Sequence, residues 1–155
     1  MLATIAGVMK KALLIITSLL VTACATAPTQ EMSDARQAVR AAHEAGAQQH
    51  APETLQEAEE QLDSAGAELH KHAFREARKD AEAAKANAIS AQDMALAIGS
   101  ATTVVDKARK HGVLSEETDN ILKQAQLAAG EGDVQLAVRL ANEARSLAEQ
   151  DLRLE

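Results

Sequence analysis

Small apolar residues recur at alternating steps of three and four positions along the middle of the chain. A spacing that averages 3.5 residues keeps one narrow stripe on the same side of a slightly supercoiled helix. Most of this stripe is alanine, whose small side chain lets a neighbouring helix approach closely. The pattern therefore predicts one long helix, from about Ala73 to Lys110, against which shorter helices pack. The stripe consists of Phe74, Ala77, Ala81, Ala84, Ala88, Ala91, Ala95, Ile98, Thr102 and Val105.

Shorter stripes with the same spacing lie on both sides of this long segment. They are Ala35, Ala38, Ala42 and Ala45; Leu55, Ala58, Leu62, Ala65 and Leu69; Leu122, Ala125 and Ala129; and Val134, Ala137, Ala141, Ala144 and Ala148. Residues that typically begin or end helices stand between the stripes. These are Gly46, Pro52, Gly112, Ser115 and the turn at residues 130–133, where Asp133 is expected to cap the last helix.

Two further places interrupt the helical pattern. His70, Lys71 and His72 mark a tight corner just before the long helix. Gly99 and Ser100 fall inside the long helix, and we expect a kink there.

The pattern partly repeats when it is shifted by sixty positions. Ala35, Ala38, Ala42 and Ala45 then fall on Ala95, Ile98, Thr102 and Val105, and Leu62, Ala65, Ala77, Ala81, Ala84 and Ala88 fall on Leu122, Ala125, Ala137, Ala141, Ala144 and Ala148. Chance agreement between Ala-rich helices is one explanation. A true repeat predicts two tandem three-helix units, residues 32–92 and 93–155. We therefore expect an all-α fold, an elongated antiparallel helical bundle of Ala-rich, coiled-coil-like heptad helices whose two units share one long central helix.

The composition indicates a thin core. The 155 residues include 35 alanines and a single Phe, with no Tyr or Trp. A buried methyl group contributes only about 0.8 kcal/mol, so helix propensity must supply much of the stability. The formal charge is −7, from 16 basic and 23 acidic residues. With neither a basic stripe nor aromatic faces for bases to stack on, the chain is not expected to bind nucleic acid.

The first residues have the order of a secretory signal. Lys10 and Lys11 precede an apolar run at residues 12–21, which is too short for a comfortable membrane span of about 20 residues. Met9 offers an alternative start, which would make residues 1–8 a misassigned extension. The next residues resemble a bacterial lipobox; they are Val21, Thr22, Ala23 and Cys24. A buried apolar helix that ends in an idle cysteine is the alternative interpretation.

The lipobox resemblance implies that a signal peptidase cuts between Ala23 and Cys24 and that Cys24 carries lipid, including palmitate-like acyl chains. Residues 1–23 would then be a signal peptide and residues 24–31 a linker, and removal of Lys10 and Lys11 would leave a charge of about −9 on the mature chain. More than one acyl chain gives stable anchoring. By analogy with bacterial sorting rules, Ala25 and Thr26 in place of Asp favour the outer membrane, with the protein facing the periplasm.

Residues 33–91 resemble a bacterial lipoprotein family known only as a domain of unknown function. In that family an Ala-rich helix leads through a Gly-Ala turn and an Ala-Pro pair into two further helices. Its members are often encoded beside, or fused to, a domain like that of outer membrane protein A, which binds peptidoglycan. This chain continues as helix where the fused domain would begin. The matching residues are Gly46, Ala47, Ala51, Pro52, Leu55, Ala58, Leu62, Ala65, Ala77, Ala81 and Ala84.

No catalytic motif is found, and we expect the protein not to be an enzyme and to need no cofactor. The histidines are the best candidates for metal ligands, although solvated corner histidines are the simpler interpretation, and we assign no metal site. They are His43, His50, His70, His72 and His111.

The last helix carries apolar residues beside its alanine stripe. They could widen an ordinary core or form a self-association or partner groove. These residues are Leu136, Val138, Leu140, Leu147, Leu152 and Leu154.

Together these observations predict a periplasm-facing lipoprotein that acts as a helical spacer or scaffold for envelope proteins. Its partners would be membrane lipid, through Cys24, and an envelope protein or a second copy of the chain. The alternatives are a periplasmic metal or small-ligand binder and a peptidoglycan-associated tether.

Overall fold

The structure, a computed structural model, describes residues 26–154. Helices make up 85% of these residues and none of them lies in a strand, which confirms the prediction of an all-α fold. Ala23 and Cys24, the predicted cleavage and lipidation residues, lie outside the described part of the chain. The helices are α2 (Thr29–Glu44), α3 (Ala47–His50), α4 (Pro52–His70), α5 (Phe74–His111), α6 (Glu116–Gly130) and α7 (Val134–Asp151).

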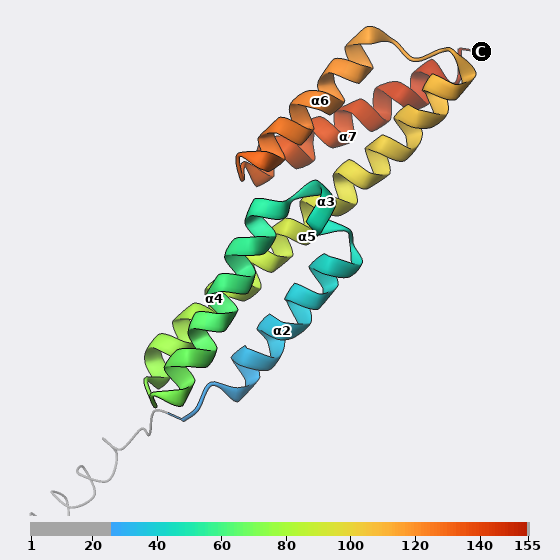
Figure 1. Ribbon diagram of the computed structural model, residues 1–155. Coiled ribbons are helices and arrows are strands. Elements are labelled where there is room, and N and C mark those ends of the chain that lie inside the picture. Colours follow the sequence, from blue (N-terminus) through green and yellow to red (C-terminus); the bar gives the residue numbers. More distant parts are fainter. Residues whose placement is uncertain (1–25, 155) are drawn as a thin grey trace, which may run out of the picture.

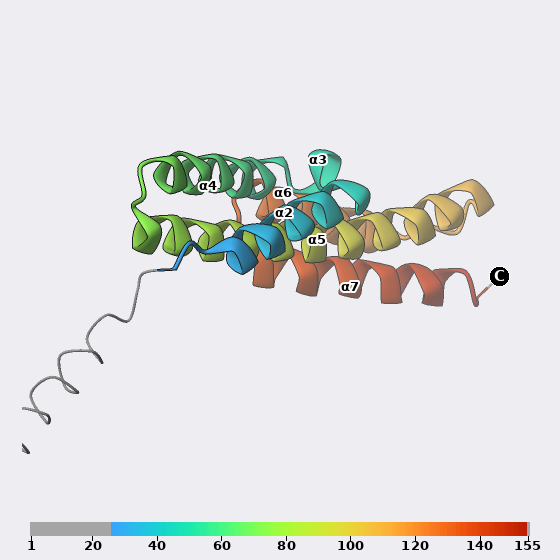
Figure 2. The same cartoon turned by 90° about the horizontal axis from the view of Figure 1, so that it is seen from below.

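Helix α5 runs through the whole molecule. Its 38 residues span about 57 Å at 1.5 Å per residue. The predicted long helix is therefore confirmed to within one residue at each end. Helices α2 and α4 lie along the first half of α5, and α6 and α7 lie along its second half (Figure 1). The view from below shows the same elongated arrangement (Figure 2).

We call α2, α4 and residues 74–92 the proximal half, and residues 93–111 with α6 and α7 the distal half. The proximal tip is the end of the rod where α4 joins α5, and the distal tip is the end where α5 joins α6. The short α3 lies between the halves and contacts both α5 and α6. Of the described helices, α5 is the one with the length and composition of a membrane span, but its alanine face is covered by the other helices.

Burial along α5 follows the predicted stripe. The alanines of this stripe, from Ala77 to Ala95, are buried, and so are Ile98 and Val105. Phe74 and Thr102 are half-buried. The buried face is wider than predicted in the second half of the helix, because α3, α6 and α7 all contact α5. The additional buried residues are Met94, Ala101 and Ala108.

The buried side chains form two clusters. The smaller one lies in the proximal half and contains Met32, Ala35, Ala65, Ala81 and Ala84. The larger one runs without a break from Val39 and Leu55 to Ala148, and so crosses residue 92, the expected boundary between two units. Met32 and Val39, which the first predicted stripe omitted, are buried, while Ala38 and Ala45 are only partly buried.

Most of the predicted helix ends are confirmed. The Ser115 hydroxyl accepts a hydrogen bond from the Thr118 N–H at 3.3 Å, and the Asp133 carboxylate accepts one from the Leu136 N–H at 3.0 Å. Pro52 occupies the first turn of α4. Gly46 follows α2 and Gly112 follows α5, both with positive φ, as expected of residues that end helices.

Two details differ from the sequence-based expectations. Helix α2 begins at Thr29, so the last three residues of the predicted linker 24–31 are helical. The helix starts early because Pro28 precedes it and Glu31 lies in its first turn, near the positive end of the helix dipole. Helix α3 was not predicted, since four residues are too few to show a periodicity. Helix α5 is continuous through Gly99 and Ser100, where a kink is expected from the sequence.

Candidate functional site

The described chain starts at the proximal tip. The Arg78 guanidinium donates a hydrogen bond to the Thr26 carbonyl at 3.3 Å and contacts the Glu31 carboxylate at 2.6 Å. Hydrogen bonding to its own backbone and to Arg78 holds the pKa of Glu31 below its usual range. Pro28 is fully buried. Residues 26–31 are therefore held against α5 and do not form a flexible linker.

The corner at this tip ends α4 with a left-handed residue. The Ala73 N–H donates to the Glu68 carbonyl at 3.0 Å and the His72 N–H donates to the Leu69 carbonyl at 3.1 Å. This is the Schellman arrangement, which normally places glycine at the left-handed position. Helices α5 and α6 end with the same pair of hydrogen bonds and use Gly112 and Gly132 there.

His72 instead holds a φ of 60° at the proximal tip. Its ring meets the ring of Phe74 edge to face, with centroids 5.7 Å apart.

The structure does not gather the predicted histidines. His70 and His72 lie at the proximal tip, His111 ends α5 at the distal tip, and His43 on α2 contacts Glu59 on α4, with 2.6 Å between Nε2 and Oε1. His50 lies at the middle of the rod. Across residues 26–154, no three His, Cys, Asp or Glu side chains are grouped in a way that could hold a metal ion.

A cavity of about 330 Å³ opens where the two halves meet. Burial lowers the pKa of His50 in its wall. The Thr102 hydroxyl, also in the wall, is buried without a hydrogen-bond partner. Sequence reasoning missed this place, because its walls come from α3, α4, α5 and α6. The lining residues are Gln49, His50, Pro52, Glu53, Thr102, Gln126 and Gly130.

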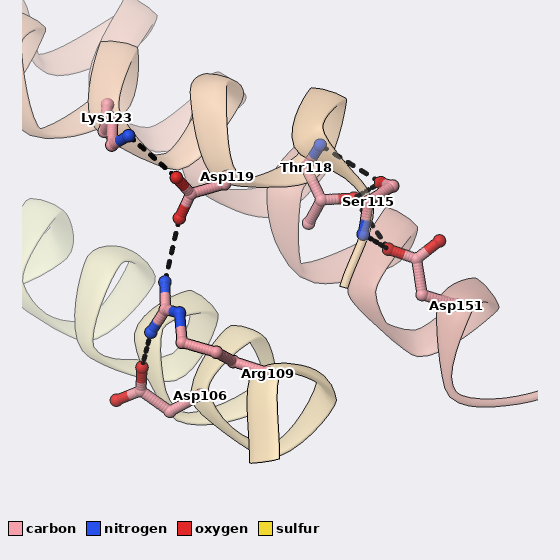
Figure 3. A network of polar contacts seen from close by, with 7 residues as sticks. All are labelled: Asp106, Arg109, Ser115, Thr118, Asp119, Lys123 and Asp151. Atoms are coloured by element: carbon pink, nitrogen blue, oxygen red, sulfur yellow. Dashed lines mark hydrogen bonds and ion pairs between the residues drawn. The ribbon is translucent and has the colours of Figure 1, made fainter. Parts of the chain in front are cut away.

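The distal tip is held by polar contacts among α5, α6 and α7 (Figure 3). The Asp151 carboxylate accepts hydrogen bonds from the Ser115 N–H and the Thr118 hydroxyl, both at 3.0 Å. Asp151 therefore binds the N-cap amide as the Glu of a capping box does, but it comes from another helix. The backbone N–H of Ser115 is the main reason why the pKa of Asp151 is lowered.

Beside it, the Asp119 carboxylate binds Lys123 at 2.7 Å and Arg109 at 2.8 Å, and Arg109 also contacts Asp106 (Figure 3). Hydrogen bonds from Lys123 and then Arg109 lower the pKa of Asp119. Ser115 was the one member of this network that the sequence identified, since capping leaves a local signal and contacts between distant helices do not.

Apolar surface is concentrated in the distal half. A groove of about 510 Å³ between α6 and α7 is lined by Ile121, Leu127, Leu136 and Leu140, with Arg139 and Glu143 among its polar residues. A second groove, of about 480 Å³, includes Leu96, Val134 and Val138.

The apolar residues beside the stripe of α7 mostly widen the core. Leu140 is buried, and Leu136, Val138 and Leu152 pack against the larger cluster. Leu154 is 87% exposed.

One family comparison gives a match. A family described as "Domain of unknown function (DUF4398)" has a sequence model that matches residues 30–106. The chain is thus similar to this family from α2 through most of α5, whereas α6 and α7 lie beyond the matched region. No curated protein and no solved structure matches the chain.

Proposed function

We propose that the protein is a non-enzymatic lipoprotein of the outer membrane that faces the periplasm and serves as a helical spacer or scaffold for envelope proteins. In this proposal acylated Cys24 holds the chain in the lipid, and two tandem three-helix units that share α5 form a rod. The observation that carries it is the attachment of residues 26–31 to the proximal tip.

This attachment gives an anchor at Cys24 a defined geometry. Thr26 is bound by Arg78 and Pro28 is buried, so the rod begins almost at once after the lipidated residue. Two residues, from Cys24 to Thr26, can span at most about 7 Å. A lipid at Cys24 would therefore hold the proximal tip against the bilayer surface.

The rod would carry its distal half away from the membrane. Helix α5 begins at the proximal tip and ends at the distal tip, about 57 Å further along. The distal half also carries most of the exposed large apolar side chains, including Leu96 at 54% and Leu127 at 68%. We propose that the grooves beside these residues bind an amphipathic helix of an envelope protein.

The anchor is tested by labelling cells with radioactive palmitate. The native chain should take up label and sediment with outer membranes, whereas Cys24→Ser should remain unlabelled and keep its first 23 residues. An unlabelled native chain that is released in soluble form from the periplasm would overturn the anchor.

The scaffold role is tested separately, by photo-crosslinking in cells from a reactive residue placed at Leu127. We expect a discrete adduct with one envelope protein. The matched position is Arg36, which is exposed on α2 in the proximal half and should give none. Equal labelling from both positions, or no adduct from either, would count against a partner in the distal groove. Pelleting of the Leu127 variant with purified sacculi in the absence of any protein adduct would favour a peptidoglycan tether.

A second candidate, a small-ligand or metal binder, has one observation in its favour. The cavity between the halves contains the buried, unpartnered Thr102 hydroxyl and the weakly basic His50. Titration with zinc and copper should raise the melting temperature of the native chain but not of His50→Ala. If metal shifts neither protein, the metal-binding form of this candidate fails.

A further inference from the structure

Several basic residues lie at the corner between α4 and α5, at the proximal tip. Residues 68–79 contain four basic residues (Lys71, Arg75, Arg78 and Lys79) and two acidic ones (Glu68 and Glu76), in a chain whose formal charge is −7. Glu31 binds Arg78 at this tip, so the net charge of the tip with Glu31 included is +1. The distal tip, residues 106–119, has three basic and four acidic residues and is therefore net negative.

The basic side chains of the proximal tip are available to a partner. The side chains of Arg75 and Lys71 are 90% and 67% exposed, and Lys79 is exposed as well. Lys71 contacts Glu68 at 3.0 Å and Arg75 contacts Glu76 at 3.2 Å. Such exposed pairs contribute little, so the cations can exchange them for stronger hydrogen bonds to phosphate.

Acidic residues far from the proximal tip do not weaken the attraction between this tip and an anionic surface. The Debye length is about 8 Å at physiological ionic strength, which is short beside the length of α5. Carboxylates in the distal half therefore exert almost no repulsion on an anionic surface at the proximal tip.

Aromatic and apolar side chains accompany the cations. Phe74 is half-buried at this corner, and the His72 ring packs against it. The chain has no other Phe and no Tyr or Trp. His72 holds the left-handed position that glycine fills at the two corresponding helix ends. Rings and basic side chains with apolar stems are characteristic of protein surfaces that lie at the level of lipid headgroups.

We propose that this surface, residues 68–79, contacts the anionic headgroups of the bilayer that holds the acyl chains. The inference rests on the proposed lipid anchor and adds a second, electrostatic attachment to it. Two attachments at one tip restrict the tilt of the rod, because the basic side chains bind headgroups while the acyl chains hold Cys24.

The test uses the acylated chain purified from membranes and mixed with neutral phosphatidylcholine vesicles or with vesicles that also contain phosphatidylglycerol. Flotation of the vesicles reports the acyl anchor. Hydrogen exchange of the amides of residues 74–76 reports the tip, since α5 has no side-chain cap and its first amides are otherwise open to water. We expect flotation with both kinds of vesicle, and slower exchange at the tip with the anionic vesicles alone.

Charge reversal shows whether the basic residues cause the difference. Each basic residue near an anionic surface strengthens attachment by about fivefold. In the variant with Lys71→Glu, Arg75→Glu and Lys79→Glu, exchange should be equally fast on both kinds of vesicle. The matched variant at the distal tip, Lys107→Glu with Lys110→Glu, should behave as the native chain does.

The outcomes separate the tip from the anchor. Flotation with both vesicles but equal exchange at the tip would overturn the headgroup contact and leave the anchor. Flotation with anionic vesicles alone would overturn the anchor and support the contact. Flotation with neither would overturn both.

Discussion

The two halves of the rod are stabilised differently, although both are built from alanine-rich helices. In the proximal half, polar pairs join the helices along their length: Lys85 binds Asp34 at 2.8 Å and Ser64 binds Asp80 at 2.7 Å. The smaller apolar cluster, which lies wholly in this half, has Met32 as its one buried side chain larger than alanine, while Val39 and Leu55 of this half belong to the larger cluster. In the distal half most polar contacts between helices lie at the tip, apart from the hydrogen bond from Arg145 to Ser100. The larger buried side chains lie in the cluster that extends through this half, for example Met94, Ile98, Val105 and Leu122.

The contacts that align the helices are therefore different from the contacts that stabilise the fold. Exposed ion pairs set how the helices of the proximal half are aligned but contribute little free energy. Buried aliphatic side chains contribute more, so the larger cluster should carry most of the stability of the rod. The proximal half should therefore open first. It is also the half whose helices the family match covers in all but the first residue of α2.

The largest effect is expected from Ile98→Ala. Ile98 is fully buried in the larger cluster, and truncation of a buried isoleucine costs about 2–5 kcal/mol. Urea unfolding followed by circular dichroism should show the whole rod destabilised. Ile89→Ala, on the same helix but 43% exposed, is the control and should change little. Equal losses from both variants would contradict the assignment of stability to the larger cluster.

Met32→Ala should cost about 2 kcal/mol, at the lower end of the same range, because its small cluster lies at the edge of the fold. Hydrogen exchange should speed up in α2 and in the first turns of α5 while α6 and α7 keep their protection. Faster exchange throughout the molecule would mean that the two halves unfold as a single unit.

Ser115→Ala should cost about 1 kcal/mol, since it removes the side-chain cap of α6 and one partner of Thr118. The midpoint of urea unfolding measures the loss. Ser146→Ala, at an exposed position on α7, provides a matched control that leaves the distal tip intact. If the two serine variants unfold at the same midpoint, the network at this tip contributes no stability.

The smallest effect concerns His50, where the halves meet. Burial lowers its pKa below the usual 6.5, so the unfolded chain binds the proton more tightly. Above pH 6.5 His50 is neutral in both states, and the free energy of unfolding has its full value. As the pH falls from 6.5 toward the lower pKa of the folded state, the unfolded chain binds the proton first, so the free energy of unfolding decreases. The melting temperature of the native chain should therefore fall more between pH 7 and pH 5.5 than that of His50→Gln. His70→Gln, at an exposed corner, should follow the native profile.

The sequence predicts the features that leave local signals. Helix ends at Gly46, Gly112, Ser115 and Asp133 were identified because capping depends on residue types a few positions apart. The stripe of α5 was identified because heptad spacing reports which face is buried.

Features that depend on distant elements were not predictable. Met94 and Ala108 are buried because further helices cover the second half of α5, and no spacing rule shows how many neighbours a helix will have. The Arg78 contact with Glu31 and the cavity at His50 bring together residues from separate helices. For the same reason, the sequence did not show that residues 29–31 extend α2 against α5.

The two ends of the described part of the chain, residues 26–154, lie at opposite tips of the rod, which offers a way to measure its tilt. Thr26 is bound at one tip by Arg78, and the C-terminal residues lie at the other, where Asp151 binds Ser115 (Figure 1). In the proposed anchored state, a fluorophore joined to the C-terminus would lie at the tip of the rod that is far from the bilayer. Energy transfer from that fluorophore to a dye in the lipid would rise as the rod tilts toward the bilayer, so the fluorescence of the donor would report the tilt angle.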